Sequence, residues 1–312
     1  MLIVNSSNAS RIAPSDFIWP NLIALITVNT FFAFSGVFLN TLVLLSFWKC
    51  SQLRRKVCYI PILVLASIDL LVVTTMHPLL IVTSIDRLIV DRKYGLFPDA
   101  NASAVHLLCG FSLLTVVAMN IERYLAIVHP YLHQRFVTKR RLLVAVLILW
   151  SFEIIEWSVT FKRLILEEYT VFWIAGIFVL IVYINCKLLI IARKKKSRDA
   201  TLVSSCTSIY KTSVEHYKVR VVGLKMAWTC IAALACYFLC FCPIVVFAAL
   251  YTFQKKSLTE LTFHFIRLWA DTFLTMNSTF NCLIFFWKNR TLRNEGMKLL
   301  KSKKKFTAVS TH

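Results

Sequence analysis

Apolar residues gather in long runs along this chain, and the stretches between the runs are short or rich in Lys and Arg. A helix needs about 20 apolar residues to cross the roughly 30 Å hydrocarbon core of a bilayer. A backbone in lipid must satisfy its own hydrogen bonds, so runs of this length are expected to be helices. Seven runs are long enough, over residues 21–48, 58–84, 102–126, 141–161, 169–192, 226–252 and 261–287. The pattern predicts an all-α membrane protein, a bundle of seven transmembrane helices.

The composition supports a membrane protein over a soluble one. Hydrophobic residues make up 58% of the 312 residues and charged residues 16%, against about 45–50% and about 25% in soluble domains. The formal charge of +21 would by itself fit a nucleic-acid or an anionic membrane partner. The apolar content decides for the membrane and argues against a nucleic-acid partner and a soluble enzyme.

The basic residues lie in alternate connections between the apolar runs. Segments 49–57 and 122–141 each carry +4, and segments 193–225 and 288–312 each carry +7, while everything else sums to −1. Cytoplasmic loops of membrane proteins carry an excess of Lys and Arg. We therefore expect a multi-pass plasma-membrane protein with its N-terminus outside and its C-terminus in the cytoplasm.

This topology divides the chain into four parts. They are an extracellular tail over 1–20, the bundle over 21–287, an amphipathic membrane-surface helix over 288–300 and a basic cytoplasmic tail over 301–312. The tail lacks the basic and apolar regions of a cleavable signal peptide. Asn5 and Asn8 each begin an Asn-X-Ser sequence there, so both are expected to be glycosylated.

Signatures of catalysis are absent from the sequence. It contains no HExxH, GxSxG or GxGxxG motif, so we predict that the chain is not an enzyme. Cysteines do not occur in the predicted outer loops, and no extracellular disulfide is expected. The two halves are not similar, as those of an inverted-repeat transporter would be.

Polar residues inside apolar spans are costly in hydrocarbon and mark function by default. These polar residues stand within short motifs, which follow one another along the chain. In order, the motifs are Asn40, Leu65–Asp69, Glu122-Arg123-Tyr124, Trp150, Tyr183, Phe238–Pro243 and Asn277–Asn281. In this order and topology the set resembles the rhodopsin-like (class A) G-protein-coupled receptors, from about residue 30 to 300. The ligand subfamily is not identified by these motifs.

The resemblance implies a conformational switch at the cytoplasmic side. Arg123 is expected to pair with Glu122 at rest, and to be freed on activation to line the cavity for a heterotrimeric G protein. Tyr183 would then pack against Arg123, and Pro243 would act as the pivot for outward movement of the sixth helix. The family also implies an extracellular ligand, and arrestin and receptor kinases as further partners.

Two positions of this switch depart from the family pattern. Phe241 replaces the usual tryptophan of the sixth span, and the Asn-Pro-x-x-Tyr motif of the seventh span becomes Asn281 to Phe285 without its proline and tyrosine. These changes leave open a receptor-like protein that does not signal. A transporter or channel is a further alternative, which the odd span count disfavours.

The central carboxylate of the second span has two interpretations. By resemblance, a sodium ion is expected among the oxygen-bearing side chains of Asp69, Ser112, Asn277, Ser278 and Asn281. Oxygen donors of this type suit a hard cation. A structural pairing of Asp69 with backbone or with Asn40 is the alternative.

The ligand is expected in the outer half of the bundle, where candidate contacts are His106, Glu153, Glu156 and Asp271. Val105 and Thr275 stand where amine receptors carry an aspartate and opsins a lysine, which disfavours both classes. If the acidic residues face the cavity, the expected ligand is cationic or a peptide.

Each of these candidates also has a purely structural interpretation. His106 could be a core histidine, Glu153 could pair with Lys162 or Arg163, and Asp271 lies four residues after Arg267, the spacing of an ion pair within one helix. Trp150, Glu153 and Trp157 share one helical stripe, which favours a Glu153 side chain that faces the bundle.

Overall fold

The described part of the chain is helical throughout, apart from short junctions. The computed structural model describes residues 14–90, 98–161, 176–177, 179–187, 190–191, 232, 235–250 and 260–309. Its long helices are α1 (Pro14–Lys49), α3 (Ile60–Val90), α4 (Pro98–Val128), α6 (Lys139–Phe161), α9 (Glu260–Lys288) and α10 (Arg290–Val309). Two short helices, α2 (Ser51–Arg55) and α5 (Pro130–Phe136), and a 3-10 turn at Val57–Tyr59 connect them.

Among the described residues, four helices are long and apolar enough to cross a membrane, at Ile18–Lys49, Val57–Asp86, Ala104–Val128 and Lys139–Val159. They correspond to the first four expected spans. A shorter apolar helix covers Ala235–Leu250, within the expected sixth span. Much of the fifth and sixth spans falls outside the described residues, so the full bundle of seven helices stays a prediction.

Helix α9 matches the expected seventh span in length but is less apolar than the other four. Polar side chains lower its hydropathy, and they are buried: Asp271, Thr272, Thr275, Asn277, Ser278, Thr279 and Asn281. A helix that turns its polar residues inward and keeps apolar ones outside can still lie in lipid, because the polar groups find partners in the bundle. The low mean hydropathy of α9 therefore comes from the polar residues on its inward face.

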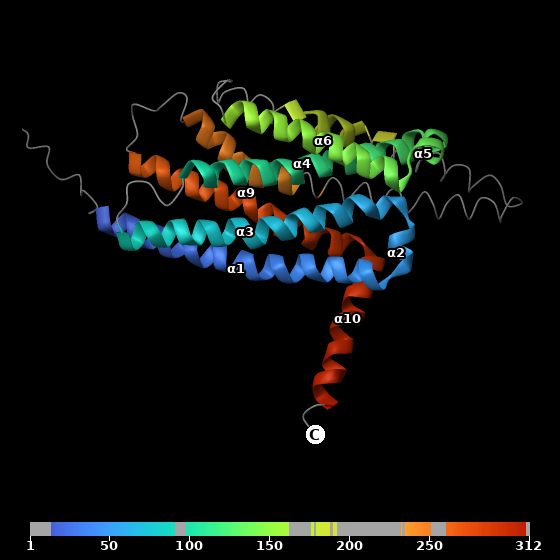
Figure 1. Cartoon of the computed structure of the whole chain (residues 1–312), viewed down its shortest axis with the longest axis horizontal. Coiled ribbons are helices and arrows are strands. Elements are labelled where there is room, and N and C mark those ends of the chain that lie inside the picture. The colour runs from blue at the N-terminus through green and yellow to red at the C-terminus, as the bar shows by residue number, and fades with distance from the viewer. Residues whose placement is uncertain are drawn as a thin grey trace, which may run out of the picture.

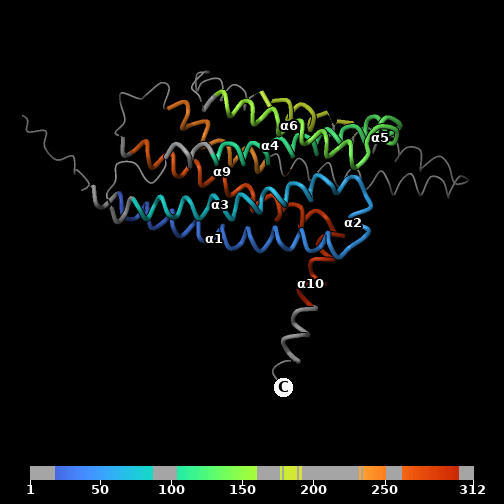
Figure 2. Tube along the Cα trace, viewed as in Figure 1, coloured from blue at the N-terminus to red at the C-terminus, as the bar shows by residue number. Residues whose placement is uncertain are grey.

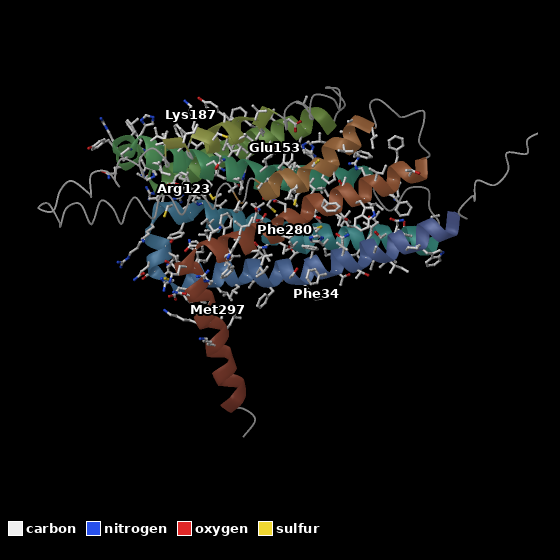
Figure 3. The ribbon with its side chains drawn as sticks, turned by 180° about the vertical axis from the view of Figure 1, so that it is seen from behind. Phe34, Arg123, Glu153, Lys187, Phe280 and Met297 are labelled. Carbon is white, nitrogen blue, oxygen red and sulfur yellow. The ribbon has the colours of Figure 1, made fainter. Side chains whose placement is uncertain are left out.

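The long helices α1, α3, α4, α6 and α9 run lengthwise beside one another, as Figure 1 shows. Buried apolar residues such as Leu65, Val72 and Val116 form the common core. Large apolar side chains cover the outside, among them Phe34, which is 76% exposed on α1 and labelled in Figure 3. Such an outward apolar surface is what a bilayer would cover.

One end of the bundle collects three of the four basic segments. Figure 2 shows α2 and α5 at the same end of the long helices, where α10 also begins. Lys139 Nζ donates to the carbonyl of Arg54 at 2.6 Å, and the Tyr59 hydroxyl donates to Asn289 Oδ1 at 3.5 Å. Segments 49–57 and 122–141 and the beginning of α10 thus share one end, as an excess of cations on one side of a membrane requires.

Helix α10 points away from the bundle, across the direction of the other helices (Figure 1). It runs to Val309, beyond the expected end at residue 300. Its root is anchored, because Leu292 is fully buried and a Cβ on Gly296 would lie 2.6 Å from the Phe286 ring. The glycine therefore permits close packing of α10 on α9.

The junction between α4 and α5 follows from a single proline. α4 ends at Val128, and Pro130 occupies the first position of α5. Helical dihedrals are disfavoured for the residue that precedes a proline, and proline itself is well suited to the first position of a helix. The chain therefore turns at His129, and the end of α4 that carries Arg123 lies against α5.

Candidate functional site

A buried polar site surrounds Asp69 near the middle of the bundle. Ser112 of α4 donates to Asp69 Oδ1 at 3.0 Å, and the Asn281 amide of α9 donates to Asp69 Oδ2 at 3.0 Å. Ser278, three residues before Asn281 on α9, is also buried. Three helices, α3, α4 and α9, thereby converge on one carboxylate that is fully buried.

Tyr237 brings a further segment, 235–250, to this site. Its hydroxyl lies 2.7 Å from Ser112 Oγ. Its ring stacks on that of Phe241, one helical turn later, with centroids 5.2 Å apart. Tyr237 thus combines an aromatic contact with Phe241 and a polar contact with Ser112, and neither contact was predicted from the sequence.

The donor set around Asp69 fits a hard cation. The Oδ1 atoms of Asn277 and Asn281 are buried and have no hydrogen-bond partner among the described residues. A buried amide oxygen without a partner is costly, and such an oxygen next to a carboxylate is suited to a small cation. The five residues expected around sodium, including Ser278, are all buried, and two of them, Ser112 and Asn281, donate to Asp69.

Asn40 connects α1 to the same region. Its amide donates to the Gly36 carbonyl at 3.0 Å and to the Ser278 carbonyl at 3.3 Å. The Cys282 thiol donates to Asn40 Oδ1 at 2.8 Å. Asn40 therefore holds α1 to the backbone of α9, while Asp69 takes its hydrogen bonds from other side chains.

A second polar site lies at the end of the bundle where the basic segments meet. Arg123 Nε and Glu122 Oε2 form an ion pair at 3.0 Å, and a second Arg123 nitrogen donates to the Cys58 carbonyl. His133 Nε2 of α5 lies 2.9 Å from Glu122 Oε1. Both Glu122 and Arg123 are buried. The carboxylate thus holds Arg123 on one side and α5 on the other, a contact with His133 that sequence reasoning missed.

The other expected switch residues are spread along the bundle. Tyr124 contacts the His129 ring, and the exposed Tyr183 lies beneath the Lys187 amine at 5.4 Å. Phe285 is buried in α9. Pro243 lies within the helix Ala235–Leu250, two residues after Phe241.

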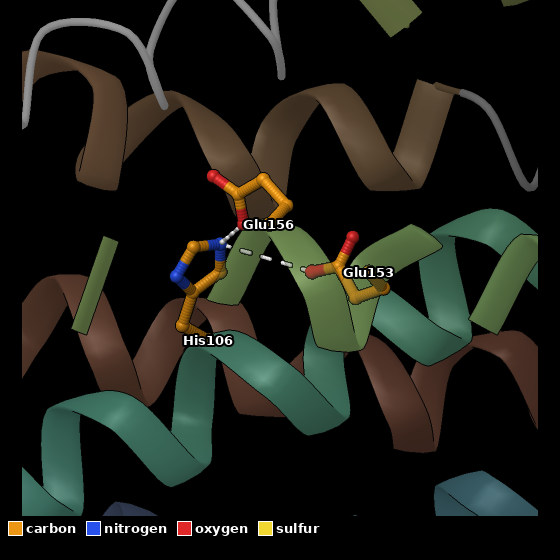
Figure 4. A group of neighbouring side chains, drawn as sticks. All are labelled: His106, Glu153 and Glu156. Atoms are coloured by element: carbon orange, nitrogen blue, oxygen red, sulfur yellow. Dashed lines mark ion pairs between the residues drawn. The ribbon is translucent and has the colours of Figure 1, made fainter. Parts of the chain in front are cut away.

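An acidic cluster occupies the other half of the bundle, between α4 and α6. His106 Nε2 lies 3.8 Å from Glu153 Oε1 and 3.6 Å from Glu156 Oε2 (Figure 4). Figure 3 shows Glu153 farther than Arg123 from the end where α10 leaves. Trp150 fixes the local register, because its indole N–H donates to both the Phe111 carbonyl and Thr115 Oγ1 at 3.2 Å.

Glu153 is buried, as expected from its place on the helical stripe that it shares with Trp150 and Trp157. The Glu153 side chain is only 4% exposed, and a Cβ on Gly110 would collide with its carboxylate. Gly110 of α4 is therefore what makes room for Glu153. Lys162 and Arg163, the alternative partners of Glu153, lie outside the described residues.

Asp271 does not join this cluster as an independent charge. Arg267 Nε lies 3.4 Å from Asp271 Oδ2, one turn earlier on α9. The ion pair within one helix, which was the alternative interpretation, is thus present. Arg267 therefore already has a partner on its own helix.

Two further predictions were glycosylation of the N-terminal tail and the absence of an extracellular disulfide. Asn5 and Asn8, the expected glycosylation sites, lie outside it. The described cysteines, among them Cys109, Cys240 and Cys282, are free thiols.

Comparison with known proteins supports the resemblance noted in the sequence. Residues 39–162 match the family described as 7 transmembrane receptor (rhodopsin family). The alpha-1A adrenergic receptor of Oryzias latipes is 25% identical over 340 aligned positions, covering 95% of this chain and 71% of that receptor. Cannabinoid receptor 1 of Xenopus laevis is 24% identical over 198 positions, covering 56% of this chain and 42% of that receptor. All are receptors rather than enzymes.

Proposed function

From the premise that this chain is a rhodopsin-like receptor, we propose that it binds an extracellular ligand and promotes nucleotide exchange on a heterotrimeric G protein. The single observation that carries the proposal is the buried ion pair between Glu122 and Arg123, 3.0 Å long, at the end of the bundle with the basic segments. A releasable ion pair in a partly dry site suits a two-state switch.

The resting state is held by contacts on both sides of Glu122. Arg123 is bound to Glu122 and to the Cys58 carbonyl, and His133 secures the other carboxylate oxygen. Activation requires that Arg123 leave these partners and face a G protein. Outward movement of the helix that contains Pro243 would open the space, and Tyr183 would then approach Arg123.

Tyr237 connects this movement to the centre of the bundle. Its hydroxyl contacts Ser112, which donates to Asp69. Moving the segment 235–250 therefore requires that the Tyr237–Ser112 contact break or slide. We propose that this contact favours the resting position.

We also propose a sodium site at Asp69, held by Asp69, Ser112, Asn277, Ser278 and Asn281. Two buried amide oxygens without partners among the described residues support it. A bound sodium ion supplies the positive charge that a buried carboxylate otherwise lacks. The protein groups provide the orientation, since α3, α4 and α9 each contribute oxygen atoms to one place.

On the extracellular side, we propose that the cluster of His106, Glu153 and Glu156 borders the ligand site and selects a positively charged group. Asp271 contributes less, because Arg267 compensates its charge. The two relatives are named for different ligand classes, so their names do not choose a ligand for this chain.

The membrane arrangement belongs to the same proposal. The N-terminal tail, with Asn5 and Asn8, lies outside the cell, and the basic end faces the cytoplasm, where arrestin and receptor kinases would also bind. Helix α10 would lie along the inner leaflet, because it points across the bundle and is rich in Lys and Arg.

The test is the loading of a GTP analogue onto a G protein in membranes that contain the receptor. A panel of G proteins, with cationic and peptide ligands, should reveal loading above membranes without receptor. Arg123→Ala should reduce loading to that background while surface expression is kept, and Arg123→Lys, which retains the charge, serves as the matched control. Normal loading by Arg123→Ala would contradict the proposal, and absence of loading by the wild type would favour the non-signalling alternative.

A further inference from the structure

We propose that His106, Glu153 and Glu156 form a binding site for a divalent transition metal, zinc above all, between α4 and α6. An imidazole nitrogen and two carboxylate oxygens lie within 4.8 Å of one another. This is the ligand chemistry that Zn²⁺ accepts in proteins. The proposal concerns metal binding and holds whether or not the receptor couples to a G protein.

The separations between the three groups suit a metal better than direct hydrogen bonds. His106 Nε2 is 3.8 Å from Glu153 Oε1 and 3.6 Å from Glu156 Oε2, whereas a good N–H···O bond is about 2.7–3.2 Å. Ligand atoms at about 2.0–2.2 Å around a tetrahedral Zn²⁺ lie about 3.4 Å from one another. The two distances from His106 exceed that spacing by only a few tenths of an ångström, and the three ligand atoms together lie within 4.8 Å of one another.

The charges point to the same conclusion. Two carboxylates in the hydrophobic part of a bundle repel each other and are costly unless a cation accompanies them. The imidazole nitrogen of His106, which faces both carboxylates, adds a third metal ligand to them. A dication between the three side chains would compensate both carboxylates at once.

The site is also built into the helices rather than left to mobile side chains. Glu153 is 4% exposed and fits against α4 only because residue 110 is a glycine. Glu153 and Glu156 are three residues apart on α6, and His106 and Gly110 are four apart on α4, so each pair shares one helical face. Figure 4 shows the imidazole of His106 facing both carboxylates.

Depth and sidedness identify the source of the metal. His106 comes eight residues after the start of α4 at Pro98, which is about 12 Å along the helix. By the predicted topology this end faces the outside, so the site would take extracellular metal. Three protein ligands leave a fourth position for water or for a donor atom of a ligand.

The experiment uses the purified full chain in nanodiscs, stripped of metal with EDTA and titrated with ZnCl₂ against a chromophoric chelator. The wild type should bind one Zn²⁺ at this site and unfold at a higher temperature with zinc than without it. Mg²⁺ and Ca²⁺ should not raise the unfolding temperature, because they prefer sites made of oxygen ligands alone.

Variants locate the site. His106→Asn and Glu153→Gln should each weaken zinc binding about tenfold or more, while the matched changes His129→Asn and Glu295→Gln, far from the cluster, should leave it unchanged. Glu156→Gln provides a second carboxylate variant if Glu153→Gln fails to fold. Wild-type zinc affinity in the cluster variants, or absence of zinc binding by the wild type, would overturn the proposal.

One more variant separates the zinc-site proposal from the signalling proposal. Arg123→Ala lies at the other end of the bundle and should bind zinc like the wild type, although it should not load a G protein. Loss of zinc binding in Arg123→Ala would mean that the effect is one of general stability, and would also overturn the assignment of the site.

Discussion

Two polar clusters in this molecule combine glutamate with histidine, and they differ in how closely the groups approach. At the end of the bundle with the basic segments, Glu122 has an arginine nitrogen at 3.0 Å and a histidine nitrogen at 2.9 Å. In the other half of the bundle, His106 faces two glutamates at 3.6 Å and 3.8 Å. The first cluster has an arginine and a histidine in direct contact with one carboxylate, and the second has two carboxylates around one histidine.

The difference shows what each cluster is suited to do. A carboxylate with partners in direct contact stabilises one conformation, because those contacts must break before the helix ends can separate. A pair of carboxylates that share one imidazole at larger distances is suited to accept a cation from outside. The same residue types therefore support an internal lock at one end and a binding site at the other.

Breaking the internal lock should have the largest effect. Glu122→Gln removes the negative charge that holds Arg123, so G-protein loading without ligand should rise several-fold above the wild type. GTP-analogue loading in matched membranes, normalised to surface expression, measures it. Glu156→Gln is the control, since it removes the same charge from the outer cluster and should not raise basal loading.

The central site offers the next largest effect. Sodium should raise the unfolding temperature of the purified wild type relative to potassium at equal ionic strength, because an ion that binds only the folded state stabilises it. Asp69→Asn removes the carboxylate and should abolish that difference. A sodium effect of equal size in the variant would rule out Asp69 as the ion ligand.

Tyr237→Phe should have an intermediate effect. It deletes only the hydroxyl that contacts Ser112 at 2.7 Å, so about 1 kcal/mol of folding stability should be lost. Basal loading should also rise modestly, because the segment 235–250 loses a contact with α4. Phe241→Leu, which removes an aromatic ring from the same stack without a polar group, tests whether packing alone accounts for the change.

The smallest effect is expected at His133. His133→Asn should weaken one side of the Glu122 lock and leave Arg123 in place, so basal loading should rise less than in Glu122→Gln. An increase as large as that of Glu122→Gln would mean that α5, and not Arg123, holds the resting state.

Much of this arrangement can be predicted from the sequence because long apolar runs and single polar residues are strong local signals. The first four spans and the partners of Asp69 follow from length, order and resemblance. The stripe of Trp150, Glu153 and Trp157 correctly indicates that Glu153 faces inward. The contacts of Tyr237 and His133 could not be predicted, because each depends on the distance between segments far apart in the sequence.

The sequence predicts where a helix occurs better than it predicts the residue at which the helix ends. α3 continues to Val90 and α10 to Val309, beyond the apolar positions that defined the expected segments. Backbone hydrogen bonds carry a helix past its apolar stripe wherever no proline or cap stops it, so hydrophobicity alone sets these limits too early. At His129, by contrast, the following proline marks the boundary in the sequence itself.

The double variant Glu122→Gln/Arg123→Ala tests the central claim, that Arg123 released from Glu122 drives nucleotide exchange. Loading of a GTP analogue is measured in membranes with equal surface expression of the wild type, each single variant and the double variant. The account predicts raised basal loading in Glu122→Gln and background loading in the double variant. Raised loading that persists without Arg123 would contradict it.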